Sequence, residues 1–305
     1  METKYSICDI TFIIKTFERE NAVRRLLNSI RSFYPNNPII ICDDSLTPYS
    51  KKFSSEFADL DISVIETEFD IGISLGRNIL VNAVKTPLFL LCDDDAEISS
   101  RTNLQYALDL FNEHHLDILA GDDVEFIRAT SSLSIILRKI QASMNLGVHK
   151  TFTGSFSIQN NILYQRSNTH IFYDYFECDI VGNAFIANTK KIQTMGGWDP
   201  DFKIKEHEDF FLRAKSNNLR IANSSNWGFN HWPETTSKEY AKARNRNYET
   251  LFLEKYNLQK WENELDDFSR ITELKQDGTA KSHFEYKATL KGQARRLYYF
   301  IRRFI

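Results

Sequence analysis

Three consecutive carboxylates, Asp93, Asp94 and Asp95, follow the apolar run Leu88-Phe-Leu-Leu-Cys92. The run predicts a buried strand, so the acids would stand together at its carboxyl end. Neighbouring carboxylates raise each other's pKa values unless a positive charge compensates them. Oxygen ligands favour Mg²⁺ or Mn²⁺, so the triplet predicts a divalent-metal site. The alternative is a solvated acidic turn that caps a helix beginning near Ser100.

Two other polar segments offer groups that suit a nucleotide. Asp43-Asp44-Ser45 presents acceptors for a base or a ribose, and Gly72 to Asn78 combines small residues with Arg77. An arginine beside such a turn can pair with a phosphate or with a planar base edge. Helix capping by Asp44 or Ser45 and a surface ion pair for Arg77 are the alternatives.

An acidic cluster, Glu206-His207-Glu208-Asp209, precedes the apolar residues Phe210-Phe211-Leu212. One of its carboxylates could act as a general base near a bound acceptor. The alternative is that acids at a helix N-terminus simply complement the helix dipole. His231, beside Trp232, is a candidate metal ligand, although a packed or surface histidine is the simpler interpretation.

Alternating strand and helix patterns must position these groups. The first half of the chain predicts strands at 10–15, 39–42, 62–66 and 88–92, with helices at 22–33 and 73–83. This alternation indicates an α/β fold with a mainly parallel sheet flanked by helices. In open α/β sheets, ligands bind beyond the carboxyl ends of the strands, where the polar segments converge.

The second half of the chain is less regular. Residues 124–179 predict loops and added strands that build a second-substrate surface, followed by a strand at 184–187 and a helix at 208–216. We predict a domain at 1–235, with a nucleotide-sugar half at about 1–123 and an acceptor half at about 124–235. A charged helical extension over 236–280 is expected to follow.

Composition indicates a soluble globular protein. The 305 residues include 38 basic and 41 acidic side chains and are 42% hydrophobic. No run of about 18 apolar residues predicts a membrane-spanning helix. The first residues lack the pattern of a secretion signal, and the widely spaced cysteines suit buried thiols, so we expect a cytoplasmic protein.

The last 25 residues form a separate electrostatic unit. Residues 281–305 contain seven basic side chains and one acid, against a net charge of -3 for the whole chain. Apolar residues recur there in steps of three or four, which predicts a basic amphipathic helix that lies on an anionic membrane surface. Docking on the protein itself or in an oligomer is the alternative. Nucleic acid is disfavoured because the rest of the chain is acidic.

Taken together, these motifs resemble an inverting GT-A glycosyltransferase of the family-2 type, with the β-1,4-N-acetylgalactosaminyltransferases of ganglioside synthesis as the nearest likeness. The resemblance runs from about Ile10 to His231. It rests on the following segments: 14–17 with Arg19, 29–35, 43–45, 76–78, 93–95, 117–121, Asp179 with Asn183, and 207–211.

The resemblance implies a role for each matching residue. Thr16, Asp44 and Arg77 would line a uridine pocket, with Asp93 and Asp94 also on the nucleotide-sugar. Asp95 and His231 would hold Mn²⁺ or Mg²⁺, and Asp209, directly before Phe-Phe, would be the catalytic base. The acceptor side would involve the following residues: Asp179, Asn183, Trp198 and Glu208. For Trp198 and Trp232, stacking on a sugar and a core or rim position both stay open.

The expected function is transfer of a sugar, N-acetylgalactosamine by preference, from UDP to a hydroxyl of a lipid-linked or capsular glycan. The lack of an amino-terminal anchor suggests a bacterial relative on the inner face of the cell membrane. The alternatives are a galactosyl-, glucosyl- or N-acetylglucosaminyltransferase, or a catalytically silent glycan-binding scaffold.

Overall fold

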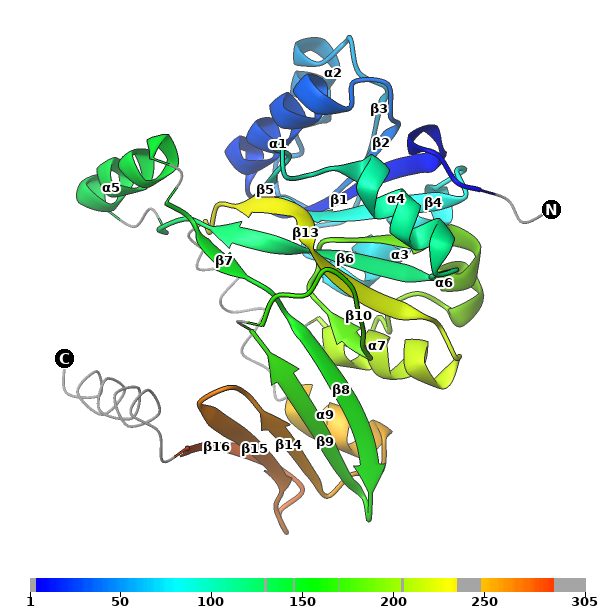
Figure 1. The fold of residues 1–305 in the computed structure, drawn as a ribbon, viewed down its shortest axis with the longest axis vertical. Helices are drawn as coiled ribbons and strands as arrows, with labels where there is room; N and C mark the ends of the chain where they lie inside the picture. Colours follow the sequence, from blue (N-terminus) through cyan, green and yellow to red (C-terminus); the bar gives the residue numbers. More distant parts are fainter. Residues whose placement is uncertain are drawn as a thin grey trace.

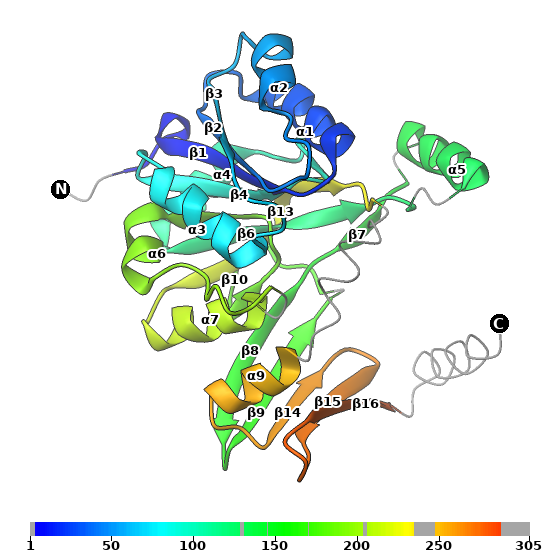
Figure 2. The ribbon, with the colours of Figure 1, turned by 180° about the vertical axis from the view of Figure 1, so that it is seen from behind.

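The computed structural model describes residues 4–128, 131–144, 146–169, 171–203, 206–234 and 248–287. It holds a large sheet covered by helices on both faces and a smaller sheet below it (Figure 1, Figure 2). In spatial order, the main strands of the large sheet are β10 (Phe176–Glu177), β13 (Ile221–His231), β6 (Ile118–Glu125), β12 (Phe185–Asn188), β4 (Leu88–Asp93), β1 (Ile10–Thr16), β2 (Ile39–Asp43) and β3 (Ile62–Glu66).

Strands β4, β1, β2 and β3 are parallel, whereas β12 is antiparallel to both of its neighbours. Two short strands lie off this path: β5 (Ala96–Glu97) pairs with β13, and β7 (Val148–Lys150) pairs with β6. The helical elements are η1 (Ile7–Asp9), α1 (Glu20–Phe33), α2 (Ser50–Glu56), α3 (Ile73–Ala83), α4 (Leu104–Glu113), α5 (Ser132–Ser143), α6 (Thr189–Met195), α7 (Glu206–Ser216) and α9 (Tyr248–Lys255).

Successive side chains of a strand point to opposite faces of the sheet, and here each face feeds a core of its own. Phe12 and Ile14 of β1 pack in one core with residues of α1, α2 and α4. Ile13, between them, packs in the other core with residues of α3, α6 and α7. Burial on both faces explains why these strands are almost continuously apolar.

The smaller sheet corrects the predicted helical extension. Its strands in spatial order are β11 (Ile180–Val181), β8 (Thr153–Gln159), β9 (Ile162–Asn168), β14 (Lys260–Glu264), β15 (Phe268–Leu274) and β16 (Ala280–Tyr286). Only 248–255 is helical among the described residues of 236–280. The strands that follow add to a hairpin contributed by residues 153–168, and β14 runs parallel to β9.

The structure confirms the predicted strands and helices between residues 10 and 93, and the α/β class. The predicted division between the two halves, at about 123, falls near the end of β6, so this strand of the large sheet spans it. The predicted basic helix is wrong for 281–286, which belong to β16, and its remainder from 288 lies outside the described residues. Among the residues that the structure describes, no helix is both long and apolar enough to cross a bilayer.

Candidate active site

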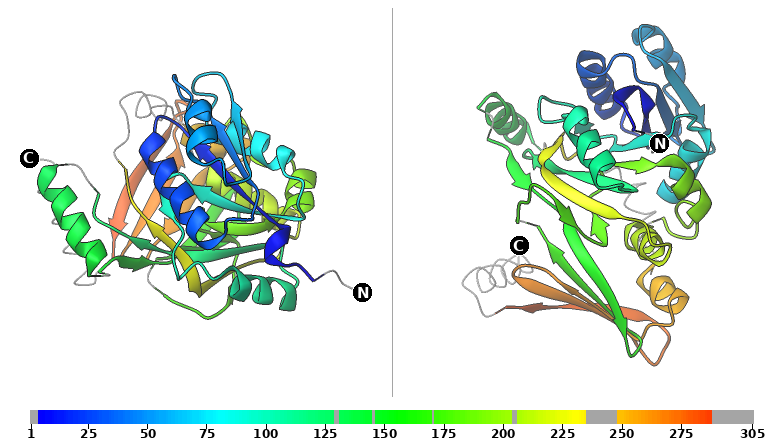
Figure 3. Two further views of the ribbon diagram at one scale, coloured as in Figure 1. Left: turned by 90° about the horizontal axis from the view of Figure 1, so that it is seen from above. Right: turned by 45° about the vertical axis from the view of Figure 1, so that its right-hand side comes forward.

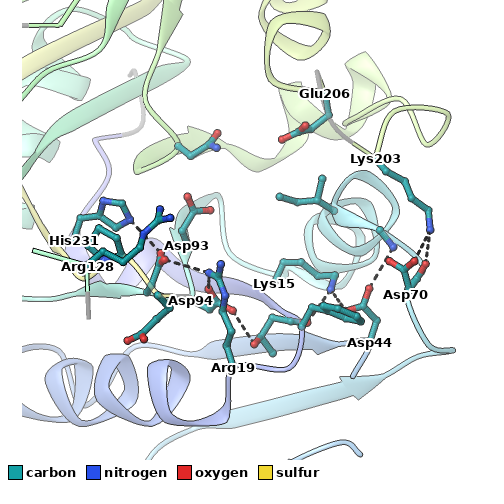
Figure 4. A pocket seen from close by; sticks show the side chains of 18 residues that line it. Lys15, Arg19, Asp44, Asp70, Asp93, Asp94, Arg128, Lys203, Glu206 and His231 are labelled. Atoms are coloured by element: carbon teal, nitrogen blue, oxygen red, sulfur yellow. Dashed lines mark hydrogen bonds and ion pairs between the residues drawn. The ribbon is translucent and has the colours of Figure 1, made fainter. Parts of the chain in front are cut away.

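A cavity of about 270 Å³ opens at the carboxyl ends of β1, β2 and β4, as the sheet topology requires (Figure 4). Its acidic lining residues are Asp44, Asp70, Asp93, Asp94, Asp95, Glu206 and Glu234. Its basic lining residues are Lys15, Arg19, Arg128, Lys203 and His231. Residues far apart in the sequence therefore meet around one space, and both signs of charge face it.

One side of the cavity is built by an ion pair between neighbouring strand ends. Lys15, near the end of β1, pairs with Asp44, which directly follows β2. The backbone N–H of Gly72 donates to Asp44 Oδ2 at 3.2 Å, and Gly72 adopts φ 92°, a conformation that favours glycine. Burial raises the pKa of Asp44, although Lys15 opposes that shift.

The acidic triplet forms the floor of the cavity. Arg19 Nη1 donates to Asp94 Oδ1 at 2.8 Å and to Asp95 Oδ2 at 3.1 Å. Thr16 Oγ1 donates to Asp94 Oδ2 at 2.9 Å. Burial nevertheless raises the pKa of Asp94 to about 6, against the opposing charge of Arg19. Burial also acts to raise the pKa of Asp95, but the hydrogen bond and charge of His231 outweigh it and lower that pKa.

His231, the last residue of β13, lies over this floor. Its Nε2 is 3.4 Å from Asp95 Oδ1, and its Nδ1 is 3.6 Å from Glu125 Oε2. Burial by itself would lower the pKa of His231, but the hydrogen bond and charge of Asp95 outweigh it and raise the pKa to about 9. The acid and imidazole predicted as metal ligands are therefore side by side.

These donors have the chemistry that Mn²⁺ or Mg²⁺ takes, namely carboxylate oxygens with one imidazole nitrogen. Asp93, Asp95 and His231 all face the cavity. Across the described part of the chain, however, no three His, Cys, Asp or Glu side chains are already gathered as a metal site. The protein alone thus offers a partial set of ligands, centred on Asp95 and His231.

Arg77 does not line the cavity, contrary to the sequence-based prediction. It is 1% exposed on α3 and lies under Trp198, with its guanidinium carbon 5.4 Å from the ring centre. Its Nη2 is 3.2 Å from Asp93 and its Nη1 is 3.3 Å from Glu206. Arg77 therefore holds Asp93 and Glu206 in place without lining the cavity itself.

Glu206 is the acid of the 206–209 cluster that reaches the cavity (Figure 4). It is the first residue of α7, so its side chain projects from the helix end that faces the carboxyl ends of the strands. Burial raises the pKa of Glu206, and the Arg77 guanidinium opposes that shift. A carboxylate with a raised pKa is a stronger base than an ordinary one, which suits a proton acceptor.

Asp209, the predicted base, is in the wrong place for that role. Its side chain is fully buried and absent from the cavity lining. It accepts hydrogen bonds from Arg213 Nε at 2.9 Å, Lys255 Nζ at 2.5 Å and Tyr256 Oη at 2.7 Å. The structure therefore assigns Asp209 to the contact between α7 and α9.

Of the predicted acceptor residues, Asn183 alone lines the cavity, and its Oδ1 is 2.8 Å from His207 Nδ1. Asp179 is bound to Lys215 Nζ at 2.6 Å and lies away from the cavity. Trp198 is 1% exposed and stacks on Phe210, so its core interpretation is the correct one. Glu208 is partly exposed and does not reach the cavity.

Sequence reasoning left several lining residues out of the site. Lys15 could have been found, because it directly precedes Thr16 at the end of a predicted strand. Lys203 and Arg128 occupy segments without regular periodicity, and only the fold brings them to the cavity. Lys203 Nζ is held there by Asp70 Oδ2 at 3.1 Å.

Comparison with known proteins supports the same reading of the fold. Residues 11–168 match the model of glycosyl transferase family 2. The chain is 29% identical over 225 residues to human beta-1,4 N-acetylgalactosaminyltransferase 1 and 28% identical over 207 residues to mouse beta-1,4 N-acetylgalactosaminyltransferase 2. These matches cover 73% and 67% of this chain but only 38% and 35% of the two relatives.

Solved structures with the same fold are more distant in sequence. Staphylococcus aureus TarS aligns with a TM-score of 0.51 at 18% identity, over 73% of this chain and 36% of that chain. GalNAc-T7, solved with UDP, GalNAc and Mn²⁺, aligns with a TM-score of 0.51 at 11% identity, over 76% of this chain and 44% of that chain. The match of the family model over more than half of the sequence shows that this chain belongs to glycosyl transferase family 2 and has the GT-A fold.

Proposed function

We propose that the protein transfers a sugar, N-acetylgalactosamine by preference, from a UDP-sugar to a hydroxyl of a glycan acceptor, with inversion at the anomeric carbon. The observation that carries this proposal is the meeting of Asp44, the 93–95 triplet, Glu206 and His231 around one cavity. The preference for N-acetylgalactosamine rests on the names of the two relatives given above. Because this chain matches little more than a third of either relative, the identity of the sugar is part of the proposal.

The position of each lining residue suggests which part of the substrate it would contact. Thr16 and Asp44 offer an acceptor-rich wall for the uridine, and the basic side chains of Lys203 and Arg128 can meet a diphosphate. Asp95 and His231 would hold Mn²⁺ or Mg²⁺, and a site with few protein ligands suits an ion that also binds substrate phosphates. The bound ion would stabilise negative charge on the departing diphosphate.

We assign the proton acceptor to Glu206 in place of Asp209. An acceptor hydroxyl that attacks the anomeric carbon must lose its proton, and Glu206 lines the cavity from helix α7, not from the strand end that carries the triplet (Figure 4). Its raised pKa, caused by burial, strengthens it as a base. Arg77, which contacts both Glu206 and Asp93, would fix the distance between the base and the nucleotide side.

The proposal is tested by a panel of donors assayed for nucleotide release with added Mn²⁺ and with a chelator. We expect turnover with UDP-N-acetylgalactosamine above that with the UDP conjugates of galactose, glucose and N-acetylglucosamine, and loss of it on chelation. Asp95→Ala should weaken metal-dependent UDP binding by about tenfold or more, since it removes a ligand.

The control variant is Asp109→Ala, which removes an exposed acid of α4 away from the cavity. It should bind UDP as the wild type does. No turnover with any UDP-sugar, in a protein that still binds UDP, would favour the silent glycan-binding alternative. Preference for another UDP-sugar would change the sugar assigned to the donor but leave the proposed transfer reaction standing.

A further inference from the structure

Helix α5 projects from the body of the molecule (Figure 1, Figure 3). It exposes an unusual number of apolar side chains. None of its described residues is buried. Of the 17 large apolar side chains that are exposed in the described ranges, nine lie between residues 127 and 148. They are Ile127, Leu133, Ile135, Ile136, Leu137, Ile140, Met144, Leu146 and Val148, each 41–66% exposed. Concentrated exposure of this kind marks a contact surface.

The apolar residues of α5 form a continuous stripe. Leu133, Ile136, Leu137 and Ile140 follow the 3–4 residue spacing that places side chains on one helix face. The opposite side meets the body through Arg138, whose guanidinium carbon lies 5.5 Å from the Trp232 ring centre. The stripe therefore faces away from the protein, where it has nothing to pack against in the chain as described.

Charge narrows the choice of partner. The sequence from 126 to 150 contains four basic residues and no acidic residue. Arg138 faces Glu234 and Lys150 pairs with Glu125 at 2.7 Å, so Arg128 and Lys139 are the charges left for a partner. Lys139 is exposed and stands next to the stripe, and Arg128, four residues before the first residue of the helix, is exposed as well. A second copy of this face would bring like charges together, whereas an anionic lipid surface accepts both the apolar stripe and its basic flank.

We propose that α5 is an interfacial helix that inserts its apolar stripe into an anionic lipid surface. Arg128 lines the cavity, and Glu234, another lining residue, lies 3.9 Å from Arg138. Docking through α5 therefore brings the mouth of the cavity to the lipid headgroups, within reach of an acceptor carried on a lipid. The docking itself does not depend on the sugar chemistry assigned to the cavity.

The test is flotation of the full-length protein with vesicles of phosphatidylcholine alone and of phosphatidylcholine mixed with phosphatidylglycerol. We expect binding to the mixed vesicles, and a fall in partition of about tenfold or more for the double variant Ile136→Glu/Ile140→Glu. The matched control, Leu46→Glu/Ile158→Glu, adds the same charge at exposed apolar positions elsewhere and should float as the wild type does.

Unfolding midpoints of both double variants should equal that of the wild type, because the replaced side chains are exposed. Equal flotation of Ile136→Glu/Ile140→Glu and wild type would overturn the proposal. Failure of the wild-type protein to bind either kind of vesicle would overturn it as well. Analytical ultracentrifugation covers the remaining case: if the α5 variant loses only self-association, the stripe is a protein contact and the lipid assignment is wrong.

Discussion

At the scale of single residues, the cluster at 206–209 shows how one acid can be chosen over another. Asp209 is held by three donors, and one of them, Arg213, lies four residues further along the same helix. That spacing is a common structural ion pair and could have been noticed in the sequence. The contacts with Lys255, the last residue of α9, and with Tyr256, which follows it, could not, because both residues lie more than 40 positions away in the sequence.

Glu206→Gln should lower the rate of transfer by about 10²–10⁴-fold while UDP affinity changes little, since the variant keeps the shape but loses the proton acceptor. In the wild type, burial raises the pKa of Glu206 above its ordinary 4.5. Only the ionised form accepts a proton, so kcat/KM should fall as pH drops through that raised pKa. Profiles of kcat/KM against pH for both proteins check this, because the fall at low pH should be absent in the variant.

Asp209→Asn is the contrasting variant. Replacing the buried anion removes the carboxylate that pairs with Arg213 and leaves Lys255 with Asp199 alone, so we expect a loss of about 2 kcal/mol or more in the free energy of unfolding. Chemical denaturation measures that loss, and assays well below the unfolding midpoint should still show transfer. A stable Asp209→Asn protein without activity, beside an active Glu206→Gln protein, would return the base role to Asp209.

At the scale of elements, what the sequence predicts depends on burial. Strands β1, β2 and β4 are buried on both faces, so they are continuous apolar runs that any periodicity analysis finds. Strands β14 and β16 are mostly half-buried or exposed and rich in charge. Their pairing with β9 and β15 is visible only in three dimensions. The same division explains why more of the predicted nucleotide-sugar residues than of the predicted acceptor residues line the cavity.

The register shift in β13 depends on a glycine. Between Asn223 and Gly228 the pairing of β13 with β6 is interrupted, and a Cβ at Gly228 would lie 1.9 Å from the backbone oxygen of Asp122. Gly228→Ala must therefore push two backbones apart, and we expect a loss of about 3 kcal/mol in the free energy of unfolding. Because β13 ends at His231, metal-dependent UDP binding should weaken as well.

Gly182→Ala is the control, because a Cβ there meets no described atom within 4 Å. Urea unfolding of both variants, with UDP and Mn²⁺ titrated into each, measures the two effects. If Gly228→Ala unfolds at the same urea concentration as Gly182→Ala, the close approach of β13 and β6 is not a structural constraint.

At the scale of the whole molecule, the smaller sheet is joined to the large sheet by a shared core. Trp261 of β14 and Phe252 of α9 belong to the same buried cluster as Phe210 and Phe211 of α7. Trp261 is 2% exposed, and its Nε1 donates to Gln165 Oε1 at 3.2 Å. Because a continuous core couples its parts, the two sheets should unfold together.

Trp261→Ala should therefore cost about 3–5 kcal/mol and lower the midpoint of one transition for the entire chain. Phe284→Ala, on the half-exposed strand β16, should cost about 1 kcal/mol or less and serves as the control. Calorimetry with and without UDP and Mn²⁺ distinguishes coupling from independence. A ligand raises the midpoint only of the unit that binds it. A single transition whose midpoint shifts both with Trp261→Ala and with UDP would show that the sheets are coupled. Two transitions, one sensitive to Trp261→Ala and the other to UDP, would show that the sheets unfold independently.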